Sequence, residues 1–253
     1  MPKMNDLTKR IRSNPFVRNF SSVKIPQDRR EVKLSAPIKP VDQRLPPKVL
    51  EAVASILVSV QWDRWRFMLP AKPLLKLDVA VVSHGHADHW HPNFRQKDIV
   101  LSPREVAVPE QFRNQNNIIR VDSEETLGKV RFVKVGQRSL ANLLRERVPP
   151  PHAFWWLVCV GNTRVIFVGD ANVGDAVLLK RFSEKMFERN LPLHCALLPS
   201  FGGTVKHKSS NARELSASFQ ELANELRDLY GMMIGALPHP VNADWADYNA
   251  FRL

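Results

Sequence analysis

The sequence predicts an α+β fold in which packed β layers are flanked by helices. Three observations support this class. Short apolar segments dominate residues 55–168, two long amphipathic patterns follow, and a short apolar run comes after each of those patterns. Because a sheet and an amphipathic helix each leave an apolar face, such a mixture is stable only when the faces pack together in layers.

The strands are predicted from alternation or from β-branched apolar runs. Residues 55–62, SILVSVQW, alternate apolar with mostly polar side chains, and residues 78–83, DVAVVS, form a continuous apolar run typical of a buried strand. Gly161-Asn162 predicts a hairpin turn. The remaining short apolar runs are residues 98–102, 117–121, 129–135, 154–160 and 164–168.

The helices are predicted from apolar stripes and from their end signals. Residues 175–189 place several large apolar side chains on one face. A second helix is expected to begin at Asn211, which has Glu214 at capping-box spacing, and to end before Gly231. The apolar runs 195–198 and 232–237 are then expected to be strands.

The basic character of the chain is concentrated near its start. The whole chain has a net charge of +12, and residues 1–50 contain 12 Lys+Arg against 4 Asp+Glu. Residues 1–47 are Pro-rich and predict an extended or partly disordered arm, with residues 48–253 as the folded domain. Such an arm could contact nucleic acid or an acidic membrane surface, and its Arg- and Ser-rich segment also fits a transit peptide.

The composition excludes some classes of protein. No window approaches eighteen consecutive apolar residues, so no transmembrane segment is expected. Cys159 and Cys195 lie inside apolar runs, which predicts small buried side chains in a reducing compartment. We expect a cytoplasmic location, or an organellar one if the basic leader is a transit peptide. The oligomeric state stays open.

The run VVSHGHADHWHP, residues 81–92, contains four of the eight histidines. His84 and His86 are two residues apart after a strand, so an extended backbone points both imidazoles the same way. Asp88 and His89 follow where the chain turns. Four potential ligands in two directions suit two metal ions, although a polar loop with accidental histidines is the alternative. His91 is expected to support the site or lie at the surface.

Together with later residues, this run resembles a known family. HGHADH resembles the His-x-His-x-Asp-His signature of the metallo-β-lactamase superfamily, and the resemblance covers roughly residues 55–240. His152 precedes a predicted strand, Asp170 closes RVIFVGD, and His239 closes MMIGALPH, which is the order of the family's later ligands. Asp63 resembles the family's first-motif aspartate, which orients the ligand loop, but a surface aspartate fits equally well.

The resemblance implies an αββα sandwich of two mixed β-sheets flanked by helices over residues 48–253. It also implies two divalent metal ions, most commonly zinc, with Mn²⁺ or Fe²⁺ as alternatives. Asp88 would also be the catalytic proton acceptor. The implied ligands are His84, His86 and His152 for one metal, Asp88, His89 and His239 for the other, and Asp170 as the bridge.

Such a centre predicts a hydrolase. A hydroxide held between two divalent ions is a nucleophile at neutral pH, because the metals lower the pKa of bound water to about 7. The layout between Asp170 and His239 resembles the branch with sugar-phosphate lactonases and lipid phosphodiesterases, so a small anionic phosphoester or lactone-type substrate is expected. Lys206 and His207 could contact its anionic group, although an exposed loop fits them as well.

Two other functions stay open, because one fold can serve many activities. The basic arm would suit a nucleic-acid-binding protein or a nuclease. Alternatively, the metals could stabilise a fold without activity. Binding to nucleic acid that falls steeply with salt and disappears on deletion of residues 1–47 would favour the former.

Overall fold

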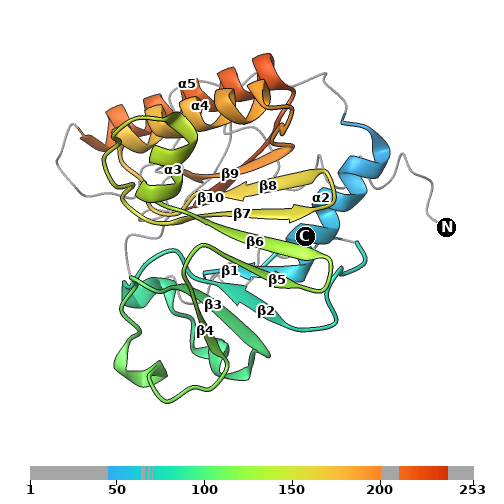
Figure 1. Ribbon diagram of the computed structural model, residues 1–253, viewed down its shortest axis with the longest axis vertical. Coiled ribbons are helices and arrows are strands. Elements are labelled where there is room, and N and C mark those ends of the chain that lie inside the picture. The colour runs from blue at the N-terminus through green and yellow to red at the C-terminus, as the bar shows by residue number, and fades with distance from the viewer. Residues whose placement is uncertain (1–44, 64–65, 68, 70, 201–210, 239–253) are drawn as a thin grey trace, which may run out of the picture.

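The computed structural model describes residues 45–63, 66–67, 69, 71–200 and 211–238, and its elements form two sheets flanked by helices (Figure 1). This arrangement confirms the predicted α+β class. The four-stranded sheet has the order β1 (Val60–Trp62), β2 (Val79–Val81), β3 (Ile99–Pro103), β4 (Ile118–Val121). The six-stranded sheet has the order β10 (Met233–Pro238), β9 (Cys195–Ser200), β8 (Thr163–Phe167), β7 (Trp155–Val160), β6 (Val130–Val135), β5 (Glu124–Leu127).

The two sheets differ in strand direction. All three pairs in the four-stranded sheet are parallel, whereas the six-stranded sheet is mixed, with β10, β9 and β8 parallel and the other pairs antiparallel. The expectation of two mixed sheets therefore describes the second sheet and not the first. Long connections between successive strands return the chain to the same end of the first sheet, as parallel pairing requires.

Alternate side chains of each central strand enter different cores. In β8, Val165 and Phe167 pack into the core between the two sheets, whereas Ile166 packs into the core on the helical side. Figure 1 shows the three covering helices together on that side of the six-stranded sheet. They are α3 (Gln137–Leu144), α4 (Val173–Glu188) and α5 (Asn211–Tyr230).

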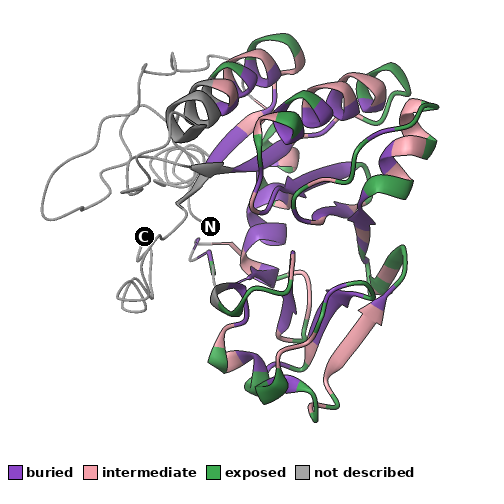
Figure 2. Cartoon of the chain, turned by 90° about the vertical axis from the view of Figure 1, so that its left-hand side faces the viewer, coloured by how far each residue is buried: buried purple, intermediate pink, exposed green. Residues whose placement is uncertain are grey.

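Short 3₁₀ helices cover the other outer face, that of the four-stranded sheet. Trp90, Phe94 and Phe112 pack there against Ala80 and Val100 of the sheet. The covering elements are η2 (Ala87–His89), η3 (Pro92–Gln96) and η4 (Glu110–Phe112). In Figure 2 most strands are purple, which marks burial, and green exposed residues lie mainly on outer helix faces and loops. The histidine run is thus part of the layer that covers the parallel sheet.

The prediction of a strand over residues 55–62 is wrong for its first part. The helix α2 (Pro47–Ser59) occupies that part, and β1 begins only at Val60. Pro47 is the first helical residue, a position that proline favours. A short apolar run such as SILVS, residues 55–59, fits a helix or a strand, and the apolar spacing that begins before it decides for the helix. The buried side chains at i, i+3, i+4 and i+7 are Leu50, Val53, Ala54 and Leu57.

The other predicted elements lie within a few residues of the observed ones. β7 and β8 form the hairpin at Gly161, whose φ of 53° is the left-handed conformation that glycine accepts easily. α5 ends before Gly231, as expected. β5 and α3 were not predicted. The proposed arm, residues 1–44 in particular, lies outside the described residues, so the domain boundary near residue 47 stays a prediction. Within the described residues, no helix is long and apolar enough to cross a bilayer.

Candidate metal centre

The fold brings together two histidines of the run and the aspartate after β8. Nε2 of His84 and Nε2 of His89 each lie 3.5 Å from Oδ2 of Asp170. One ligand atom from each of the three residues lies within 4.8 Å of the other two. With metal–ligand bonds of about 2.0–2.1 Å, two ligands of a tetrahedral ion lie about 3.3 Å apart. The spacing and the donor types therefore fit a metal ion.

Two strand ends place these residues. The histidine run follows β2, and Asp170 follows β8 after a short extended segment. Gly169 lets the two loops touch, because a Cβ on this residue would lie 2.9 Å from Cβ of Ser83 and 3.2 Å from Cβ of Ala153. A glycine before Asp170 is therefore a packing requirement of the centre.

Asp63 lies directly behind the histidines. Its side chain is fully buried, so the alternative interpretation as a surface aspartate is wrong. Oδ1 accepts a hydrogen bond from the backbone N–H of Ser83 at 2.8 Å, and Oδ2 lies 2.7 Å from Nδ1 of His89. The residue has a φ of 47°, in the left-handed region that aspartate and asparagine tolerate better than most residues.

Ser83 extends the influence of Asp63 to the second histidine. Its hydroxyl donates to Oδ2 of Asp63 at 2.9 Å and lies 2.9 Å from Nδ1 of His84. Since the hydroxyl proton is used toward Asp63, the hydroxyl oxygen accepts from Nδ1–H of His84. One buried carboxylate thus directs the Nε2 lone pairs of His84 and His89 toward Asp170. Sequence reasoning missed Ser83, although its place between a buried strand and the first histidine was the available signal.

The electrostatic surroundings keep His84 in the form that binds metal. Burial of the ring, followed by the neighbouring His89, lowers the pKa of His84 from 6.5 to about 4. The imidazole is therefore neutral at pH 7, as a metal ligand must be.

The other predicted ligands are placed less closely or not described. His86 is exposed, with Nδ1 3.0 Å from Nε2 of His84. His152 is exposed, and its ring centroid lies 6.5 Å from that of His84. Asp88 lies in η2, but its side chain is outside the described part, as is the whole of His239. Lys206 and His207 also lie outside the described residues, so all these assignments stay predictions.

A second buried aspartate, Asp175, was not predicted at the site. It is 1% exposed in the first turn of α4, and its carboxylate accepts hydrogen bonds from the backbone N–H of Asn172 at 2.7 Å and of His152 at 3.2 Å. Burial raises the pKa of this carboxyl. Asp175 therefore ties the loop that carries His152 to the loop after Asp170.

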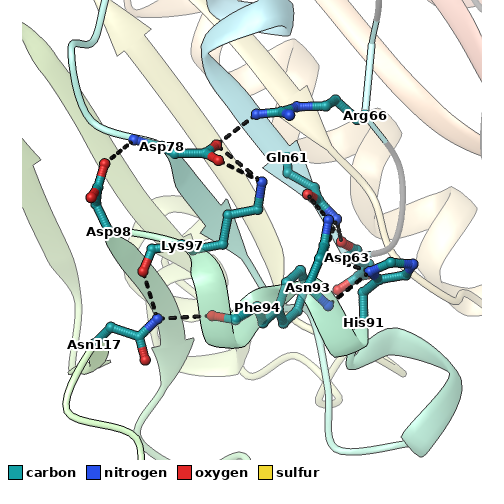
Figure 3. Close-up of polar contacts among 10 residues, drawn as sticks. All are labelled: Gln61, Asp63, Arg66, Asp78, His91, Asn93, Phe94, Lys97, Asp98 and Asn117. Carbon is teal, nitrogen blue, oxygen red and sulfur yellow. Dashed lines mark hydrogen bonds and ion pairs between the residues drawn. The ribbon is translucent and has the colours of Figure 1, made fainter.

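Figure 3 shows hydrogen bonds that connect Asp63 with Gln61, Asn93 and His91. Nε2 of Gln61, a residue 2% exposed, donates to the backbone carbonyl of Asp63 at 3.1 Å. Nδ2 of Asn93 donates to Oε1 of Gln61 at 3.3 Å, and the ring of His91 lies against the side chain of Asn93. His91 thus contacts η3 through Asn93, and its supporting role stays a prediction.

The cysteines offer no competing nucleophile. Both are buried and free, as predicted, and burial raises the pKa of the Cys195 thiol to about 12. The thiolate, which is the nucleophilic form, is therefore not available at neutral pH.

No family model and no curated protein matches the chain. Among solved structures it is similar to the metallo-beta-lactamase fold protein YhfI from Bacillus subtilis, with 13% identity and a TM-score of 0.38 over 67% of this chain and 68% of that one. A possible metal-dependent hydrolase from Veillonella parvula has 15% identity and a TM-score of 0.35 over 59% of this chain and 61% of its own. A variant of the CmlA beta-hydroxylase has 14% identity and a TM-score of 0.36 over 62% of this chain.

This chain spans about a third of the CmlA structure's length, 32%, and 61% of the Veillonella protein's. With identities of 15% or less and TM-scores below 0.5, these likenesses do not by themselves assign an activity.

Proposed function

We propose that this chain is a metal-dependent hydrolase whose centre is built around His84, His89 and Asp170. The observation that carries the proposal is the position of Oδ2 of Asp170, 3.5 Å from Nε2 of each histidine. The equal spacing supports the proposal that Asp170 would bridge two ions, with His84 holding one and His89 the other. His86, His152, Asp88 and His239 would complete the ligand set.

The residues around this centre fit a bound cation. The donors are imidazole nitrogen and carboxylate oxygen, which suit zinc and related divalent ions. When bound, the ions would lower the pKa of a coordinated water and stabilise negative charge on the substrate. Asp63 and Ser83 would hold both imidazoles with Nε2 deprotonated. Oriented ligands of this kind depend on their hydrogen-bonded supports for affinity.

The substrate we propose is a small anionic phosphoester or lactone-type compound. Neither cysteine supplies a thiolate nucleophile, because burial raises the pKa of both thiols. The attacking group is therefore proposed to be water, activated at the centre, with Asp88 as the proton acceptor. Two ions per chain, most commonly zinc, are part of the same proposal.

Metal analysis tests the proposal. The metal content of purified wild-type protein and of the Asp170→Ala variant is measured by elemental mass spectrometry. Both proteins are then assayed with bis(4-nitrophenyl) phosphate and a simple lactone, before and after removal of metal with a chelator. We expect about two ions per wild-type chain, fewer in the variant, and hydrolysis that chelation abolishes and metal restores. Wild-type protein with less than one ion per chain would exclude the two-metal centre. Full occupancy without hydrolysis of either substrate would favour a metal-stabilised fold.

A further inference from the structure

A cavity of about 710 Å³ extends from the candidate metal centre to the first turn of α3. His84 and His152 line it, and so do Lys134 and Arg138. Its volume falls within the range of about 300–1,000 Å³ that is usual for small-molecule sites. Most of the other lining residues are polar, among them Ser123, Gln137, Ser139 and Asn142.

Most of the charge on the cavity wall is already neutralised. Nζ of Lys134 lies 2.7 Å from both carboxylate oxygens of Glu105. Asp122 is paired with Arg104, at 2.9 Å. These two pairs contribute hydrogen-bonding groups to the wall but little net charge.

Arg138 is the exception among the charged lining residues. It is exposed, and within the described part of the chain no ion pair joins it to a carboxylate. It also stands in the first turn of α3, which contains no acidic residue. A cation in that position is opposed by the helix dipole, which favours anions there. This unfavourable position of a cation at a helix start, which no carboxylate among the described residues offsets, is a local conflict of the kind found at functional sites.

The backbone at the same place adds to the positive potential. Leu140 is the first residue of α3 whose N–H bonds back within the helix, to the carbonyl of Gly136. The N–H groups at the start of a helix lack such partners. Gly136, Gln137, Arg138 and Ser139 all line the cavity, so this end of the helix faces it. The guanidinium and the helix start therefore favour the same kind of ligand group, an anion.

We infer that this cavity is the substrate pocket and that Arg138 binds a phosphate group carried by the substrate away from its reacting bond. The assignment of the reacting end to the metal centre rests on the proposed function. The volume of the cavity favours a small organic phosphate over a nucleic acid strand, and Ser123, Gln137 and Asn142 on its wall can hydrogen-bond to hydroxyl groups of the ligand's body. Arg138 is thus a specificity-determining residue of this chain.

Binding to metal-free protein tests the inference separately from the metal centre. The chelated full-length chain is titrated calorimetrically with D-glucose 6-phosphate, with D-glucose and with inorganic phosphate. We expect saturable binding of glucose 6-phosphate, weaker binding of inorganic phosphate and none of glucose. Arg138→Ala should weaken glucose 6-phosphate binding by about tenfold or more, as loss of a charge-assisted hydrogen bond does. Arg138→Lys keeps the charge but lacks the planar guanidinium, so its affinity for glucose 6-phosphate should lie between those of the wild type and of Arg138→Ala.

Arg147→Ala is the matched control, because Arg147 is exposed, lies on the connection after α3 and does not line the cavity. Circular dichroism checks that each variant is folded. The inference is overturned if the wild type does not bind glucose 6-phosphate or if Arg138→Ala binds it as tightly as the wild type. It is also overturned if Arg147→Ala weakens glucose 6-phosphate binding as much as Arg138→Ala does. Arg138-dependent binding of a short oligonucleotide in preference to the sugar phosphate would also overturn it. Failure of the metal centre, by contrast, would appear in the metal analysis alone.

Discussion

Replacing Asp63 by asparagine tests how one buried carboxylate directs two metal ligands. The carboxylate accepts three hydrogen bonds, from the backbone N–H and hydroxyl of Ser83 and from Nδ1–H of His89. Asparagine keeps the size of the side chain and tolerates the φ of 47° at this position. Its NH₂ group, however, would face the Ser83 hydroxyl and the His89 ring, which both donate to Oδ2 in the wild type.

The expected loss follows from these contacts. Removing the charged acceptor of a buried hydrogen bond costs about 1–3 kcal/mol. His89 can reduce this cost by moving its proton to Nε2, but that nitrogen then cannot bind metal. Loss of such a support typically weakens metal affinity by about 10–100-fold. We therefore expect both a lower free energy of unfolding and weaker zinc binding in Asp63→Asn.

Zinc affinity is measured by competition with a chromophoric chelator, and the free energy of unfolding by urea denaturation of the metal-free protein. Asp122→Asn is the control, because the Asp122 side chain is 67% exposed and its ion pair among the described residues is with the equally exposed Arg104. The control should match the wild type in both measurements. Wild-type zinc affinity in Asp63→Asn would refute the idea that Asp63 sets the protonation of the histidines.

Three further perturbations test the packing and the electrostatics of the centre. Gly169→Ala places a Cβ 2.9 Å from Cβ of Ser83. We expect the free energy of unfolding, measured by urea denaturation, to fall by about 1–3 kcal/mol, and zinc binding to weaken. Wild-type stability would refute the close contact. Asp175→Ala removes the acceptor of the hydrogen bond from the backbone N–H of His152. The variant should have a free energy of unfolding lower by about 1–3 kcal/mol and a higher zinc dissociation constant. Unchanged values would show that this hydrogen bond does not fix the loop that carries His152. In metal-free protein the pKa of His84 is lowered to about 4 in the folded state, whereas the unfolded chain takes up the proton near pH 6.5. Folding stability should therefore fall as the pH drops from about 6.5 towards 4, and His84→Gln should reduce that dependence in urea denaturation across pH.

The sequence predicted the elements whose pattern is long or whose ends are marked. α4 and α5 have apolar stripes over several turns, and the hairpin at Gly161 has a turn signal between two apolar runs. The prediction for residues 55–59 failed because a short apolar run, SILVS, is compatible with both the helical and the strand period. β5 was missed because its residues, EETL, are mostly polar and lie at the edge of the sheet.

The sequence also predicted which residue types could hold a metal, because imidazole and carboxylate groups at the HGHADH spacing are visible without a fold. It left Asp63 undecided between support and surface. Burial decided this, since a carboxylate with no exposed surface needs donors, and the fold supplies them from a strand end 20 residues away. Asp175 was missed for the same reason, because its partner at His152 lies 23 residues away.

By itself, then, the sequence determined the α+β class, the candidate ligands and the basic start of the chain, all of which follow from local pattern and residue chemistry. Only the tertiary structure decided that His84, His89 and Asp170 lie within 4.8 Å of one another, and that a cavity connects His84 with Arg138. The physical reason is that these distances depend on how the strands from the two sheets end at one edge. That geometry is set by packing between residues far apart in the chain, which no local pattern records.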